Sequence, residues 1–142
     1  MVIKVKQLLL RLGIVLAFLI LFAGLFILLR RPETPQTETL PDSAEGRAAW
    51  LNLRGWQVGE PEISEAVMPE EWLTPNGQSW LKLQHAQGIR PEQYAGAAIT
   101  RCRYPLKNGT GPEMYAELLL CENALAGAVV YDAETQLMRP VR

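Results

Sequence analysis

The chain has 142 residues, of which 49% are hydrophobic and 20% are charged, and its formal net charge is −1. This near-neutral total hides an asymmetry, because all 15 acidic residues follow residue 31, where only nine of the 14 basic residues lie. The chain beyond residue 31 therefore carries a net charge of −6, which excludes the broad basic surface that nucleic acid requires. Its length allows one small domain with a single core.

The first element in chain order is an apolar run that starts at Leu12 and ends at Leu29. Its 18 residues carry no charge, and 14 of them are Leu, Ile, Val or Phe. As a helix the run would be about 27 Å long, close to the ~30 Å hydrocarbon core of a bilayer. It lacks the polar stripe of a surface helix in a soluble domain. We therefore predict a transmembrane helix over 12–29, with the lipid bilayer as its partner.

A cleaved signal peptide is the alternative, since Lys4, Lys6 and Arg11 are compatible with its basic N-terminal region. The apolar run is longer than the ~7–15 residues typical of signal peptides, and no small-x-small cleavage site follows it. We expect an uncleaved, single-pass anchor in the cell membrane, with residues 1–11 as a cytosolic tail. Basic residues are balanced across the run, so this orientation rests on the short, acid-free tail.

Three small residues in the run, Gly13, Ala17 and Gly24, are four and seven positions apart and share one helix face. Such a face lets two helices approach closely, which would give a weak homodimer. Ordinary small residues of an apolar helix are the alternative explanation.

Residues 30–41 read RRPETPQTETLP and contain three prolines, three threonines and two glutamates. This composition buries no core and predicts an extended, solvated tether. The folded domain is expected to follow over 42–142, outside the cytosol. Its first half predicts two helices, over 44–54 and 77–87, the first capped by Asp42 or Ser43.

Several segments have the composition of extended chain. They are 56–58, 63–68, 97–106, 115–121 and 125–132. The first two are short, whereas the last three predict consecutive strands of an antiparallel meander. Residues 132–142 are compatible with a last short strand or a frayed tail. The sequence thus predicts an α+β fold: one N-terminal transmembrane helix, then a small domain of two helices and an antiparallel β-meander.

The domain has two cysteines, Cys102 and Cys121, and a location outside the cytosol would permit a disulfide. If the turn after the first long strand centres near residues 109–110, Arg103 lies opposite Glu117, and the cysteines point to opposite sheet faces. We therefore expect two free buried thiols, and a Cys102–Cys121 disulfide is the less favoured alternative.

The candidate binding residues are Arg101, Arg103 and Trp72. The two arginines share one face of a predicted strand, where they could bind an anion. A solvated basic edge facing Glu117 is the alternative, and such a cross-strand pair contributes ~0.2–1 kcal/mol. Trp72 is one of four tryptophans expected in the core; an exposed tryptophan would instead be a recognition residue.

The sequence predicts no catalytic, cofactor or metal site. One histidine, His85, and two cysteines 19 positions apart do not match the spacing of zinc ligands. Glu70 with Glu71, or Glu60 with Glu62, could serve a carboxylate-based hydrolase, but surface solvation is the simpler explanation of these pairs.

The order of these pieces resembles a family of single-span proteins from Gram-positive, mainly clostridial, bacteria, called domain of unknown function 4830. The matching stretches, within residues 42–139, are LNLRGWQV, AVMPEEW, WLKLQHAQGIRPEQYAG, TRCRY and AELLLCENALAGAVV. Cys102 and Cys121 replace aromatic residues of the family pattern, and Ala126-Gly127-Ala128 replaces Gly-Gly-acid. The resemblance implies the topology of the domain and no activity, because the family has none established.

Together these features predict a membrane-anchored, extracytoplasmic binding module without a cofactor, whose partner is an envelope protein or a peptide. Catalytic activity is not expected. Two alternatives stay open: a carboxylate-based cell-envelope hydrolase, and a structural or assembly subunit of an envelope complex.

Overall fold

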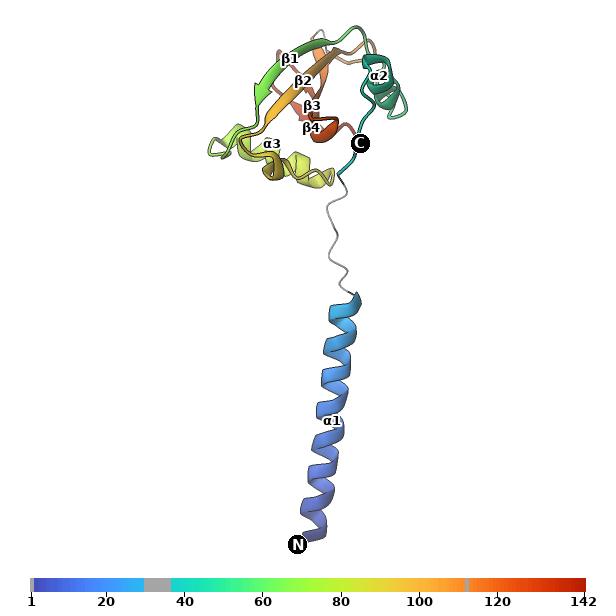
Figure 1. Cartoon of the computed structure of the whole chain (residues 1–142), viewed down its shortest axis with the longest axis vertical. Helices are drawn as coiled ribbons and strands as arrows, with labels where there is room; N and C mark the ends of the chain where they lie inside the picture. The colour runs from blue at the N-terminus through green and yellow to red at the C-terminus, as the bar shows by residue number, and fades with distance from the viewer. Residues whose placement is uncertain (1, 30–36, 112) are drawn as a thin grey trace. The chain divides into compact units, whose positions relative to one another are not determined.

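The computed structural model describes residues 2–29, 37–111 and 113–142, in two compact units (Figure 1). The first unit contains helix α1, Val2–Leu29, which begins well before the predicted span at residue 12. Its stretch Lys4–Ile27 is long and apolar enough to cross a membrane, and none of its side chains is buried. A helix of this kind near the N-terminus suits a membrane anchor or a signal sequence.

The second unit, within the described residues, is a five-stranded antiparallel sheet with two α-helices and one short 3-10 helix. The strands lie side by side in chain order. The elements are α2 (Ala44–Asn52), β1 (Glu62–Val67), α3 (Pro75–Ala86), η1 (Pro91–Tyr94), β2 (Ala98–Pro105), β3 (Met114–Cys121), β4 (Ala124–Asp132) and β5 (Met138–Arg139). The α+β class is therefore confirmed. The finer prediction, two helices and then a meander, was incomplete, because β1 precedes α3 and joins the sheet at its edge.

Local sequence sets where the two α-helices of this unit begin. The Ser43 hydroxyl accepts a hydrogen bond from the Gly46 amide at 3.0 Å and caps α2. Thr74 caps α3 in the same way through the Gly77 amide, also at 3.0 Å. Pro75, whose fixed φ suits the first turn, follows this cap, so α3 starts two residues before the predicted residue 77.

The hairpins follow the alternation of the strands. Arg103 lies opposite Glu117 in the β2–β3 register, as the sequence predicted. Strands β3 and β4 are joined by Glu122 and Asn123, whose φ angles are 50° and 73°. Two consecutive residues in this left-handed region form the tight turn that suits the twist of a hairpin.

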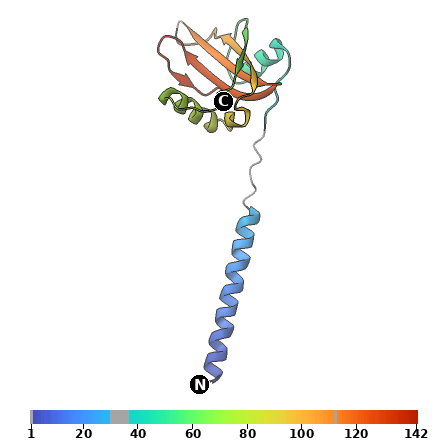
Figure 2. The same cartoon turned by 60° about the vertical axis from the view of Figure 1, so that its left-hand side comes forward.

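Each face of the sheet has its own hydrophobic cluster. On one face, α2 contributes Leu51, which is fully buried with Cys102 and other strand residues. On the opposite face, α3 lies against the sheet, as Figure 2 shows. Here Trp80 packs so closely on Gly127 that a Cβ at this glycine would lie 2.8 Å from the indole ring. Any larger residue at position 127 would push α3 away from β4.

The segment before α2 belongs to the folded unit. Leu40 is buried, and its amide donates to the Asn123 carbonyl at 2.8 Å. The Leu125 amide donates in turn to the Glu38 carbonyl at 2.8 Å. The unit therefore begins several residues before the predicted boundary at residue 42, because a buried leucine outweighs the proline-rich composition around it. Residues 30–36, the rest of the predicted tether, lie outside the described residues.

Candidate functional site

Beyond Trp80, the same face of the sheet carries charged and aromatic side chains that we call the open sheet face. Residues directly opposite each other in an antiparallel sheet point to the same side, so the register gathers side chains of three strands. The open sheet face consists of Arg101, Arg103, Tyr115, Glu117 and Tyr131, all half-buried. It includes both arginines that the sequence singled out.

Arg101 and Glu117 form an ion pair on the open sheet face. The Arg101 Nε donates to a Glu117 carboxylate oxygen at 2.8 Å, and a terminal nitrogen lies 2.7 Å from the same oxygen. This hydrogen bond raises the pKa of the Arg101 guanidinium, and the ion pair adds no net charge to the open sheet face. Register alone places Glu117 opposite Arg103, yet the carboxylate reaches diagonally across the strands to Arg101.

Arg103 has no such partner. Its guanidinium carbon lies 3.9 Å from the ring centre of Tyr115 and 5.5 Å from that of Tyr131, within the ~6 Å of a cation–π contact. The two tyrosine rings stack, with centres 5.7 Å apart. The Arg103 Nε is enclosed without an acceptor, and no ion pair to Arg103 occurs among the described residues. Even Glu62, its register neighbour on β1, is exposed and unpaired with it.

Tyr131 completes the open sheet face. Burial raises the pKa of its phenol, and the nearby Glu117 carboxylate adds to the rise. The phenol therefore stays neutral at physiological pH, where its hydroxyl can donate a hydrogen bond. The open sheet face thus combines a neutralised arginine, an arginine without a counter-ion, and an aromatic surface. A carboxylate can bind an unpaired guanidinium through two parallel hydrogen bonds.

Trp72, the third predicted binding residue, belongs to the packing around α3. It is half-buried and stacks on Trp80, with ring centres 6.2 Å apart and planes 11° apart. Among the described residues, no hydrogen bond or ring contact joins Trp72 to Arg101 or Arg103. The two arginines and Trp72 are therefore treated as separate features.

The two cysteines lie on opposite sides of the sheet, each as a free thiol. Cys102 is fully buried in the larger cluster, where burial raises the pKa of its thiol against the opposing effect of Arg47. Cys121 is half-buried beside the smaller cluster. This separation follows from the register that places Arg103 opposite Glu117.

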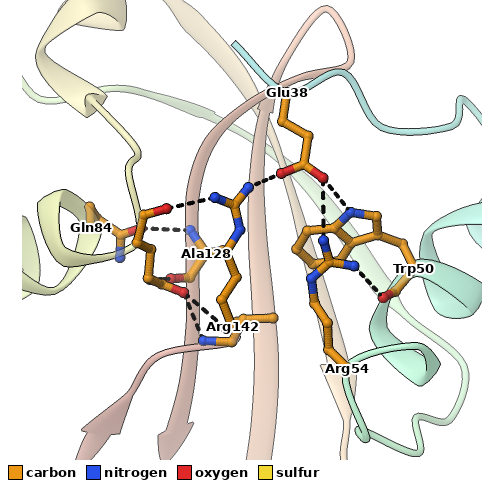
Figure 3. A network of polar contacts seen from close by, with 8 residues as sticks. Glu38, Trp50, Arg54, Gln84, Ala128 and Arg142 are labelled. Carbon is orange, nitrogen blue, oxygen red and sulfur yellow. Dashed lines mark hydrogen bonds and ion pairs between the residues drawn. The ribbon is translucent and has the colours of Figure 1, made fainter. Parts of the chain in front are cut away.

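A second group of polar side chains surrounds Glu38 (Figure 3). One carboxylate oxygen accepts a hydrogen bond from the Trp50 indole at 2.8 Å and lies 3.4 Å from an Arg54 nitrogen. The other oxygen pairs with Arg142. The Arg54 guanidinium also lies 3.5 Å from the centre of the Trp50 ring. Because both oxygens of Glu38 have partners, we interpret this network as a structural one that holds the segment before α2 in place.

Two glutamines of the α3 region bind the backbone of β4. The Gln84 side chain accepts from the Ala128 amide at 2.8 Å (Figure 3). Gln87 donates to the Ala128 carbonyl at 2.9 Å. Gln87 also accepts from the Val141 amide at 2.8 Å. Neither residue was predicted from the sequence as a contact, because glutamines usually lie on the surface. The available signal was position: they follow Trp80 by four and seven residues, on the same helical face.

The described residues contain no group of three or more His, Cys, Asp or Glu that could hold a metal ion. His85, in the last turn of α3, pairs with Glu92. A recess lined by Glu38, Ile89 and Arg142 among others has a volume of about 10 Å³, room for one water molecule.

Comparison of the chain with protein-family models, curated proteins and solved structures found no match. The resemblance to domain of unknown function 4830 therefore stays a prediction, and the function must be argued from the open sheet face and α1.

Proposed function

We propose that this chain is a membrane-anchored binding module whose open sheet face binds a small ligand with one carboxylate, such as a short peptide. Arg103 is the proposed receptor for the carboxylate. The proposal treats α1 as an uncleaved anchor, with its N-terminal end in the cytosol and the second unit outside.

The observation that carries the proposal is the state of Arg103. Its guanidinium lies 3.9 Å from the Tyr115 ring centre and has no counter-ion among the described residues, whereas Arg101 two positions earlier is neutralised by Glu117. A stacked guanidinium loses less side-chain freedom when it binds, because its plane is already oriented. A carboxylate that reaches it gains two parallel charge-assisted hydrogen bonds.

The charges around Arg103 support a ligand with a single anionic group. The chain beyond residue 31 carries −6, so a polyanion would be repelled at long range. The Arg101–Glu117 pair adds no net charge, and the stacked rings of Tyr115 and Tyr131 offer an apolar surface beside Arg103. An anion with an adjacent apolar or aromatic group fits this combination.

The proposed ligand class is tested with matched peptides. N-acetylated dipeptides with a free C-terminal carboxylate are titrated into the full chain in neutral-detergent micelles, and the same dipeptides with a C-terminal amide serve as controls. The Arg103 Nε–H signal in an NMR spectrum is the readout. We expect a saturable shift with the carboxylate and at least about ten-fold weaker binding of the amide, because the amide forms no charge-assisted hydrogen bond.

The matched protein variants are Arg103→Gln and Arg90→Gln, the second at an exposed arginine on another part of the surface. Arg103→Gln should lose carboxylate binding, which is then read from the Tyr131 ring signals, and Arg90→Gln should keep it. Equal binding of carboxylate and amide, or equal binding by the two variants, would contradict the proposal.

The anchor and its orientation are tested separately. A reporter fused after Arg142 that is active only outside the cytosol should be active, and the chain should remain with membranes after alkaline extraction. A mature chain that lacks its first thirty residues would show that α1 is a cleaved signal sequence.

A further inference from the structure

The edge strand β1 presents a free backbone edge to solvent. β1 pairs with β2 on one side and ends the sheet on the other. The Met68 amide donates to the Ala97 carbonyl at 2.9 Å. Together with the β1–β2 register, this hydrogen bond shows which residues of β1 have backbone groups that point towards β2. Even-numbered residues therefore bond towards β2. The amides and carbonyls of the intervening residues, Ile63, Glu65 and Val67, point away from the sheet.

The side chains at these three positions form an apolar–acidic–apolar row. They share one face, opposite the face that carries Arg103, because the register places Ile63 across from Cys102. Ile63 is 51% exposed and Val67 66% exposed, and Glu65 is exposed between them. Edge strands are commonly protected by proline, by charged side chains, especially lysine, or by a bulge. β1 contains no proline or lysine, and its charged residues are Glu62 and Glu65.

We propose that the free edge of β1 accepts an extended segment of another protein as a sixth, antiparallel strand. The segment would carry a basic residue opposite Glu65 and apolar residues two positions to either side, opposite Ile63 and Val67. Backbone hydrogen bonds supply the affinity in this mode of recognition, and alternate side chains supply the specificity.

Charge decides between this partner and a second copy of the chain. If two β1 strands paired antiparallel with their outward-bonding rows 63, 65 and 67 aligned, Glu65 would face Glu65, and like charges directly opposite each other destabilise a strand pair. A basic residue opposite Glu65 reverses the sign of that interaction. Glu65, in the middle of the row, therefore favours a cationic partner over a second copy of the chain.

The test uses a synthetic peptide with the pattern TVTKTVT, blocked at both ends and fluorescently labelled. Binding to the full chain in neutral-detergent micelles is measured by fluorescence anisotropy, beside the peptide TVTETVT. We expect the lysine peptide to bind about ten-fold more tightly, since an attractive pair replaces a repulsive one. Glu65→Lys should reverse this preference, and Glu71→Lys, at an exposed residue outside the strand, should leave it unchanged.

Backbone methylation tests the ladder itself. A methyl group on the lysine amide nitrogen removes a donor that faces β1 and should abolish binding. A methyl group on the amide nitrogen of a flanking threonine removes a donor that faces away and should change binding little. Equal affinity of the lysine and glutamate peptides, equal effects of the two methyl groups, or stable self-association through β1 would overturn the proposal. Arg103→Gln should bind the peptide normally, so failure here is distinct from failure of the carboxylate site.

Discussion

Gln87 allows a quantitative test of how α3 is held to the sheet. Replacing it with methionine keeps the size of the side chain but removes the donor to the Ala128 carbonyl at 2.9 Å and the acceptor of the Val141 amide at 2.8 Å. Ala128 and Val141 are 1% and 2% exposed, so water cannot replace the lost partners. Each of the two buried groups left unsatisfied costs ~1–3 kcal/mol, so Gln87→Met should lower the free energy of unfolding by about 2–6 kcal/mol.

The assay is urea unfolding of the full chain in neutral-detergent micelles, followed by tryptophan fluorescence. All four tryptophans lie in the second unit, so the signal reports this unit and not α1. Gln93→Met, at an exposed glutamine of η1, is the matched control and should change stability by less than ~0.5 kcal/mol. A loss of this size at Gln87 is a large share of the ~5–15 kcal/mol that stabilises a typical domain.

The glutamate variant at the same position separates the two hydrogen bonds. In Gln87→Glu a carboxylate would face the Ala128 carbonyl, and burial would raise the carboxyl pKa in the folded state. A raised folded pKa gives stability that is fully present below the unfolded pKa and is lost as pH rises through the folded pKa. The deficit of Gln87→Glu should therefore shrink as pH falls below neutrality. Equal stability of Gln87→Met and Gln93→Met would refute the reasoning.

Three further outcomes follow from other parts of the second unit. Alkylation of the native protein should label Cys121 and spare Cys102, because Cys102 is fully buried and burial raises the pKa of its thiol. In urea both cysteines should be labelled. Equal labelling rates in the native protein, measured by mass spectrometry, would contradict this. Burial raises the pKa of the Tyr104 and Tyr131 phenols, so stability should be full below pH ~10 and fall as pH rises through the folded pKa values. Absorbance of tyrosinate checks this, and Tyr131→Phe should lessen the fall. Glu38→Ala should lower the free energy of unfolding by about 1–3 kcal/mol. Glu38→Gln should lower it by less, because the amide keeps an acceptor for the Trp50 indole. Unchanged stability of Glu38→Ala would contradict a stabilising role of the network.

Sequence patterns predicted the parts of the fold that burial controls. Strand β3 alternates buried and half-buried residues, and a turn centred near residues 109–110 was enough to place Arg103 opposite Glu117. Strand β1 was expected only as a short extended segment, because five of its six residues are exposed and no apolar face marks it.

The candidate site was predictable to a smaller extent. Alternation along one strand placed Arg101 and Arg103 on a common face, but it could not tell which of them Glu117 would neutralise. Which arginine pairs with Glu117 depends on how far the side chains extend across the sheet, and the alternation of residues in the sequence does not encode this. Likewise, the composition around Leu40 is that of a tether, and contacts with residues distant in sequence, such as the hydrogen bond from the Leu40 amide to the Asn123 carbonyl, are what make this segment part of the fold.

The attachment of Leu40 to the β3–β4 turn bears on how the second unit would respond to mechanical tension. A pull on the chain from its N-terminal side would act first on the Glu38 side chain and on the hydrogen bond from Leu40 to Asn123. These contacts would give way under load while the five strands stay paired, so the segment before α2 would act as a sacrificial link that yields before the sheet does.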